Sequence, residues 1–250
     1  MANNKKNRTG EENINNFGSH MIIKEYRQWN DIDVYFPEYE WTLEHIEYSQ
    51  FKKGQVKCPY EPRVCNIGFF GDGKYSHKEY PIHYDHWKAM INRCCNDSRY
   101  ANCEVCKEWL NFQNFCLWFE ENYYEILGET MCLDKDILVK GNKIYSPDTC
   151  CFVPNNINVL FASRKNDRGS YPIGIKSKKA NGKFEVSCSI TRNKNKKRQY
   201  LGVYDSIEEA FAIYKDFKEN YIKQIADEYM CYLPLEVYNA MYNWEVDITD

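Results

Sequence analysis

The spacing of apolar residues changes along this chain of 250 residues, and this change is the strongest limit on its fold. From Met21 to about residue 70, apolar side chains alternate with polar ones, which is typical of short antiparallel strands. A helical spacing begins at about Tyr84, and short strand-like runs return from residue 131. The sequence therefore predicts an α+β protein made of several modules, and not one large core.

The module boundaries follow from these changes and from the polar stretches between them. The predicted order is a disordered tail over residues 1–19, a small β module over 20–78, a Cys-rich helical segment with a finger over 79–165, a three-stranded sheet with one helix over 168–229, and a tail over 230–250. The last tail contains a short amphipathic piece, residues 235–244, for which packing is the expected role.

Two helices are predicted in the Cys-rich segment. The first buries one face, formed by Trp87, Met90, Ile91 and Cys94. The second covers about residues 108–124 and points its aromatic residues inward. Near the C-terminus, Ser206 and Glu209 form a capping box that begins a third helix.

Basic residues are concentrated in one window. Residues 164–200 contain twelve Lys and Arg against only Asp167 and Glu185, a net charge of +10, so the rest of the chain carries −13 because the whole chain has −3. Such a block is the electrostatic pattern expected of phosphate binding, and a solvated loop face is the alternative.

The same window predicts three strands, over residues 173–175, 184–190 and 199–203, that place polar side chains on one face of a sheet. Phe184, Val186 and Cys188 would pack on the helix. The candidate DNA-binding residues are Lys183, Glu185, Ser187 and Ser189 on the solvent face, rimmed by Lys176, Lys178, Lys197 and Arg198. The major groove of double-stranded DNA is wide enough to admit β-strands, with Lys and Arg on the phosphates.

Four short motifs in this region have the pattern of a known protein family. They are Gly174-Ile175-Lys176, Gly182-Lys183-Phe184, residues 200–204 and Glu208-Glu209-Ala210. Residues 168–229 resemble the apetala/ethylene-response-factor DNA-binding domain, which reads the major groove with its sheet. An aromatic residue that the plant family carries before its Gly-Lys pair is missing here, so the resemblance implies no base preference.

A second likeness lies in the finger, in the strings at residues 133–137, 141–143 and 146–150 and in Asn158. They resemble the HNH (ββα-metal) endonuclease finger, in which a His activates water and a divalent ion such as Mg²⁺ meets the scissile phosphate. The resemblance implies catalytic positions at Asp134, Lys135, Asp136 and Asn158. Lys135 replaces the His and Thr149 replaces the middle Asn, so Asp136 is a substitute base or a second metal ligand.

Residues 21–229, with Arg93-Cys94 and the Cys103–Trp109 string, also resemble a phage and prophage group of HNH-type endonucleases. This resemblance implies a phage-encoded DNA endonuclease in the cytoplasm of a bacterial host. The changes at Lys135 and Thr149 motivate the alternative, a non-catalytic DNA-binding regulator. A third reading is an inhibitor of host defence that binds a host protein, because the acidic remainder of the chain resembles nucleic acid in charge.

The chain has 12 Cys and no apolar leader at its start, which predicts a reducing compartment without structural disulfides. Cys103 and Cys106 have the spacing of half a zinc site, which Cys94 and Cys150 (or their neighbours Cys95 and Cys151) would complete as structural Zn²⁺. Buried thiols are the alternative. No stretch approaches the roughly 20 apolar residues that span a membrane.

Overall fold

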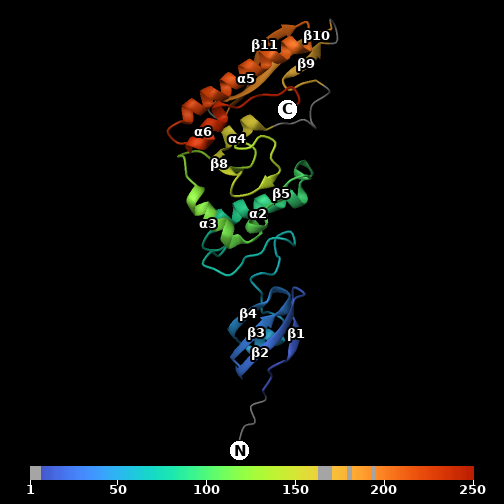
Figure 1. Cartoon of the computed structure of the whole chain (residues 1–250), viewed down its shortest axis with the longest axis vertical. Coiled ribbons are helices and arrows are strands. Elements are labelled where there is room, and N and C mark those ends of the chain that lie inside the picture. The colour runs from blue at the N-terminus through green and yellow to red at the C-terminus, as the bar shows by residue number, and fades with distance from the viewer. Residues whose placement is uncertain (1–6, 163–170, 179–181, 193–194) are drawn as a thin grey trace, which may run out of the picture. The chain divides into compact units, whose positions relative to one another are not determined.

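The computed structural model describes residues 7–162, 171–178, 182–192 and 195–250 (Figure 1). It is a mixed α and β protein with several small sheets, as the sequence predicts. The chain forms two compact units. Unit 1 is Met1–Ala101 with Val105–Phe119, and unit 2 is Asn102–Glu104 with Glu120–Asp250. Within the described parts of the chain, no helix has both the length and the apolar character needed to cross a membrane.

Unit 1 begins with a four-stranded antiparallel sheet in the order β1-β2-β3-β4. Its strands are β1 (Glu12–Ile14), β2 (His20–Gln28), β3 (Asp31–Phe36) and β4 (Trp41–Ile46), followed by the short helix α1 (Tyr48–Lys52). Met21 and Ile23 are buried, alternate with less buried neighbours, and pack with Phe51 of α1 in one core. The predicted antiparallel strands are therefore confirmed in this module.

The first ordered strand starts earlier than the sequence indicates. Residues 7–19 include β1, and Asn15 and Ser19 are buried. Both side chains bond to the buried Glu61, with 2.8 Å between Asn15 Nδ2 and Glu61 Oε1. The expected disordered tail is thus wrong for residues 7–19, because a distant carboxylate satisfies their polar groups; residues 1–6 lie outside the described part.

The helical part of unit 1 is built on aromatic residues. Helix α2 (Pro81–Asn96) buries Trp87, Met90 and Ile91 as predicted, whereas Cys94, predicted for the same face, is only half-buried. The expected second helix is divided, since the 3-10 helices η2 (Ser98–Tyr100) and η3 (Lys107–Leu110) precede α3 (Phe112–Asn122). Trp87 Nε1 donates a hydrogen bond of 2.7 Å to the carbonyl of Trp109, which ties α2 to η3.

Unit 2 begins with the finger. Its elements are β6 (Met131–Asp134), β7 (Ile144–Tyr145), β8 (Cys151–Pro154) and α4 (Asn155–Phe161), and the two-residue strand β5 (Glu104–Val105) precedes them in the chain. Strands β6 and β8 pair antiparallel, with Asp134 opposite Cys151. The paired strands β6 and β8 are followed directly in the chain by α4.

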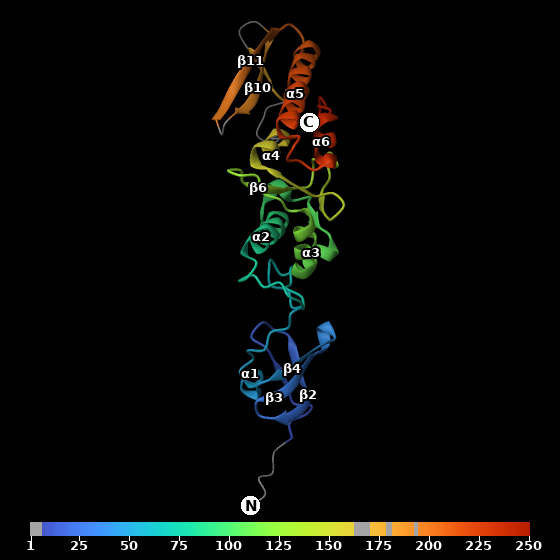
Figure 2. The same cartoon turned by 90° about the vertical axis from the view of Figure 1, so that its left-hand side faces the viewer.

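The second part of unit 2 is a three-stranded antiparallel sheet in the order β11-β10-β9, covered by α5 (Figure 2). Its elements are β9 (Ile175–Lys178), β10 (Lys183–Arg192), β11 (Asn195–Tyr204), α5 (Ile207–Tyr229) and α6 (Leu235–Tyr242). Ser206 Oγ accepts a hydrogen bond of 3.1 Å from the Glu209 amide, so the predicted cap begins α5.

Helix α5 belongs to two cores. Near its start, Ala210 and Tyr214 pack on the sheet. Toward its end, Ile222, Ile225 and Ala226 pack with the finger and with α6. The predicted boundary at residue 165 and the separate tail over 230–250 therefore differ from the structure, because apolar packing joins the finger, the sheet domain and the tail in one unit.

Candidate functional site

The candidate interface is the face of the three-stranded sheet opposite α5. Ile175, Val186 and Cys188 are buried on the α5 side. Side chains of directly paired residues share a face, so the register defines the other side. Lys176 pairs with Glu185, Lys178 with Lys183, Ser187 with Tyr200, and Ser189 with Arg198. We call these eight residues the outer face.

Four of the eight residues of the outer face are cations. Lys176, Lys178 and Arg198 are exposed, and Lys183 is partly exposed. Glu185, the one carboxylate among the eight, lies 3.5 Å from the Lys178 ammonium. The face therefore presents four cations around a single carboxylate.

Lys183 has a carboxylate partner at the edge of this face. Its ammonium lies 2.8 Å from Asp205, and this hydrogen bond raises the pKa of Lys183 above its usual value. Both side chains are well exposed. Lys183 therefore stays charged at neutral pH while its partner remains open to solvent.

Ser187 and Lys197 differ from the sequence prediction. Ser187 is only 5% exposed, because Arg198 lies over it and donates a hydrogen bond of 2.7 Å from Nε to Ser187 Oγ. Lys197 pairs with Ile190 and so belongs to the α5 side of the sheet, since neighbours in a strand point to opposite faces. The expectation that Ser187 faces solvent is wrong, and Lys197 is exposed but does not share a face with Arg198.

Tyr200 is a member of the outer face that the charge pattern did not single out. It is 56% exposed and pairs with Ser187 just after a register shift. Tyr200 is two residues after Arg198 in the same strand, and this spacing in the sequence predicts that both side chains lie on one face.

The backbone of this sheet explains why two positions of the sequence motifs are glycine. Gly174 has φ +79°, and a Cβ there would lie 2.1 Å from the Tyr214 ring. Gly202, with φ +129°, lies next to the register shift of β10 and β11. A side chain at Gly174 would push Tyr214 and α5 away from the sheet.

Part of the basic window lies outside the described residues, namely Arg164, Lys165, Arg168, Lys179 and Lys194.

In the finger, Asp134 is engaged in fixing the chain. Its Oδ1 accepts hydrogen bonds from the amides of Asp136 (2.7 Å) and Ile137 (2.8 Å). Burial raises the pKa of Asp134, although these two bonds favour the carboxylate. The carboxylate that opens the motif therefore caps the turn after β6.

Lys135, at the position of the family's general base, is a donor in the structure. Its side chain is only 5% exposed, and its ammonium donates to Asp136 Oδ2 (2.7 Å) and to the Asn142 carbonyl (3.0 Å). Asn142 Nδ2 returns a hydrogen bond of 2.9 Å to the Lys135 carbonyl. An ammonium held by two acceptors cannot take a proton from water.

Thr149 also serves the loop. Its hydroxyl donates to the Ile144 carbonyl at 2.9 Å and lies 2.8 Å from Ser146 Oγ. Asn142 and Thr149 therefore both hold the loop between β6 and β8.

The residues of the finger do not fit a divalent ion in this arrangement. Among the described residues, no group of three or more His, Cys, Asp or Glu side chains is placed to hold a metal. Asp134 and Asp136 are bonded to the loop itself, and the side chain of Asn158, half-buried on α4, forms no hydrogen bond with another described residue. Among the described residues of the finger, Asp136 Oδ1 is the buried side-chain atom without a hydrogen-bond partner.

The four cysteines of the predicted zinc site are divided between the units. Cys94 and Cys106 belong to unit 1, and Cys103 and Cys150 to unit 2. Burial raises the pKa of Cys106 to about 11. Six cysteines are buried, namely Cys58, Cys103, Cys116, Cys150, Cys151 and Cys188. The zinc site stays a prediction, and buried thiols account for half of the cysteines.

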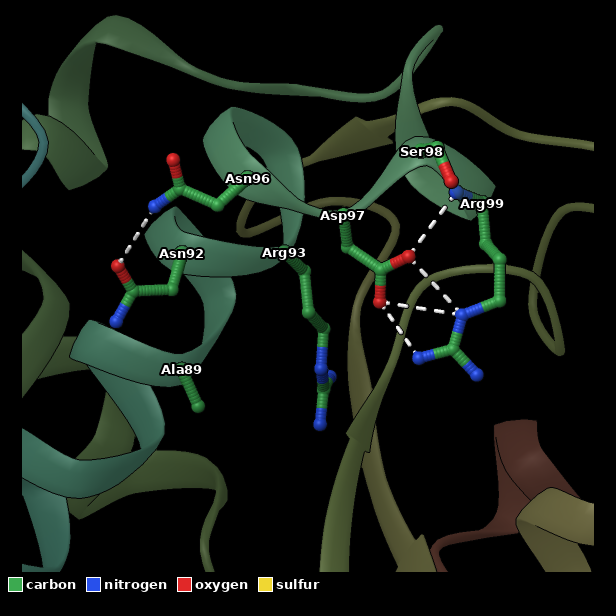
Figure 3. A pocket seen from close by; sticks show the side chains of 7 residues that line it. All are labelled: Ala89, Asn92, Arg93, Asn96, Asp97, Ser98 and Arg99. Atoms are coloured by element: carbon green, nitrogen blue, oxygen red, sulfur yellow. Dashed lines mark hydrogen bonds and ion pairs between the residues drawn. The ribbon is translucent and has the colours of Figure 1, made fainter.

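An open hollow of about 590 Å³ lies at the C-terminal end of α2 in unit 1 (Figure 3). It is lined by polar side chains that include Asn92, Arg93 and Asn96. Two of its lining residues, Asp97 and Arg99, form an ion pair of 2.6 Å with each other.

Comparison of the chain with protein-family models, with curated proteins and with solved structures found no match in any of the three.

Proposed function

We propose that this protein binds double-stranded DNA through the outer face of β9, β10 and β11. The observation that carries the proposal is the register, which gathers Lys176, Lys178, Lys183 and Arg198 on an exposed face that α5 does not cover. Such cations neutralise phosphates and release counterions, the main source of affinity for DNA.

We place the sheet in the major groove, which is wide enough to admit a two-stranded β-ribbon. The four cations would contact phosphates and fix the orientation of the sheet. Glu185 lies among them as an acceptor, and an acceptor in the major groove favours the amino group of cytosine. Tyr200 would add contact area beside Arg198.

Binding can be tested with fluorescein-labelled duplex DNA and polarisation. We expect salt-sensitive binding that the double variant Lys176→Glu/Arg198→Glu loses. The control is Lys24→Glu/Lys53→Glu, which makes the same change of charge at exposed positions of unit 1. An equal loss of DNA affinity in both variants would mean that the overall charge of the protein, and not the outer face, accounts for binding. Absence of binding by the unaltered protein would overturn the proposal and favour a protein partner.

A second candidate is cleavage of the bound DNA by the finger. It rests on the order β6, β8, α4 and on the buried, unpartnered Asp136 Oδ1. The bonds of Asp134 and Lys135 oppose it. Incubation of supercoiled plasmid with Mg²⁺ or Mn²⁺, with and without EDTA, decides between the endonuclease and the regulator. Nicks that EDTA prevents and that Asp136→Ala abolishes would establish cleavage.

A further inference from the structure

Two free thiols of unit 1 lie together where a tight turn packs against α2. Val64 and Gly68 pair across the turn, with hydrogen bonds of 3.0 Å and 2.9 Å between their backbones. A Cβ at Gly68 would lie 2.6 Å from Ile91 Cδ1, so the backbone of the turn touches α2 directly. The position of Cys65 against the helix is fixed by this contact.

Cys65 is held on one face of α2. Its Sγ donates to Asn92 Oδ1 at 2.9 Å and accepts from Asn96 Nδ2 at 3.4 Å. Figure 3 shows Asn92 and Asn96 side by side, linked by their own hydrogen bond of 3.4 Å. Cys95 is three residues after Asn92, so its side chain lies on the same side of the helix. Cys94 is two residues after Asn92 and points away from that side.

The backbone of the turn supports a special role for Cys65. Cys65 has φ +51° and Asn66 has φ +58°. Asn adopts this left-handed region readily, but Cys does not, and such a conformation persists only where its surroundings impose it. The packing of Gly68 on α2 imposes it here, and it aims the Cys65 thiol at the helix.

We propose that Cys65 and Cys95 are a thiol pair that forms a reversible disulfide with a small-molecule disulfide as oxidant. The Cys95 thiol hydrogen-bonds to Cys65, and it is exposed while Cys65 is half-buried. Burial and this hydrogen bond raise the pKa of Cys95.

The disulfide forms by thiol–disulfide exchange in two steps. The Cys65 thiolate attacks one sulfur of glutathione disulfide, which forms a mixed disulfide and releases one glutathione thiolate. Cys95 then loses its proton, and its thiolate attacks the Cys65 sulfur and releases the second glutathione. Two protein thiols are oxidised, and one glutathione disulfide is reduced to two glutathiones. The bond closes residues 65–95 into a ring and fastens the turn to the end of α2.

Treatment of the full-length protein with glutathione disulfide, followed by thiol counting and peptide mapping, tests this proposal. We expect loss of two thiols, a linked Cys65–Cys95 peptide that dithiothreitol separates, and a higher melting temperature. Cys95→Ser and Cys65→Ser should each abolish the linked peptide, whereas Cys231→Ser, at an exposed thiol of unit 2, should not. Any of three results would overturn the proposal. They are a mixed disulfide of Cys95 with glutathione that persists, a disulfide that joins Cys94 in place of Cys95, and no loss of thiols. The result is independent of DNA binding.

Discussion

Replacement of Lys135 by Met tests whether this residue stabilises the finger or serves catalysis. The substitution keeps most of the side-chain volume and removes the ammonium. Two acceptors then lose their donor, the Asp136 carboxylate at 2.7 Å and the Asn142 carbonyl at 3.0 Å. Water can replace the donor at Asp136, whose side chain is 38% exposed, but it reaches the buried Lys135 position poorly.

The expected cost follows from these two bonds. A hydrogen bond to a charged group contributes about 1.5–3 kcal/mol, and one to a carbonyl about 1 kcal/mol. Because Asp136 is partly exposed, its hydrogen bond contributes at the low end of that range. We therefore expect the free energy of unfolding to fall by roughly 2–3 kcal/mol. For a chain of this size, that corresponds to a fall in melting temperature of about 4–12 °C.

The assay is thermal unfolding of purified variants, with Lys143→Met as the control. Lys143 is exposed in the same loop, so its substitution should change stability by less than about 0.5 kcal/mol. Lys135→His introduces the base of the HNH family, and we expect it to be destabilised and inactive on plasmid DNA with Mg²⁺. Full stability of Lys135→Met together with Mg²⁺-dependent cleavage by Lys135→His would refute this reasoning.

Three further substitutions test other parts of unit 2. Gly174→Ala should cost about 2–4 kcal/mol, because its Cβ would meet the Tyr214 ring, whereas Gly182→Ala, with φ +68° and open space around it, should cost only about 1 kcal/mol in the same melting experiment. Ser206→Ala removes the cap of α5 and should cost about 1 kcal/mol. The raised pKa of Asp134 means that the folded state binds its proton more tightly than the unfolded chain does, so this group favours folding increasingly as pH falls toward the ordinary pKa of a carboxyl group, about 4. Asp134→Asn keeps the acceptor of the turn and should flatten that part of the profile, and an unchanged profile would contradict the assignment.

The parts of the fold that were predictable from sequence depend on local patterns. The alternation around Val186 and Cys188 gave the correct buried face of β10, and the Ser206 cap gave the start of α5. The helical spacing of Trp87, Met90 and Ile91 likewise gave the buried face of α2. In each case, the information lies within one element.

The features of the fold that the sequence did not predict depend on contacts between residues that are distant in sequence. The order of residues 7–19 requires Glu61, and the burial of Ser187 requires Arg198. The grouping of the finger with α5 and α6 comes from apolar packing among three separate segments. The sequence likewise identified Lys135 as a departure from the HNH pattern, but its bond to the Asn142 carbonyl appears only in the folded loop.

The dependence of DNA affinity on salt concentration tests the central claim most directly. The outer face predicts that the triple variant Lys176→Ala/Lys178→Ala/Arg198→Ala has a shallower slope of log affinity against log salt, by about 2.7 if each cation neutralises one phosphate of the duplex. The control is Lys24→Ala/Lys52→Ala/Lys53→Ala, which removes three exposed cations from unit 1 and should leave the slope of the unaltered protein. An unchanged slope in the first variant, or an equal change in the second, would contradict the assignment of this face to DNA.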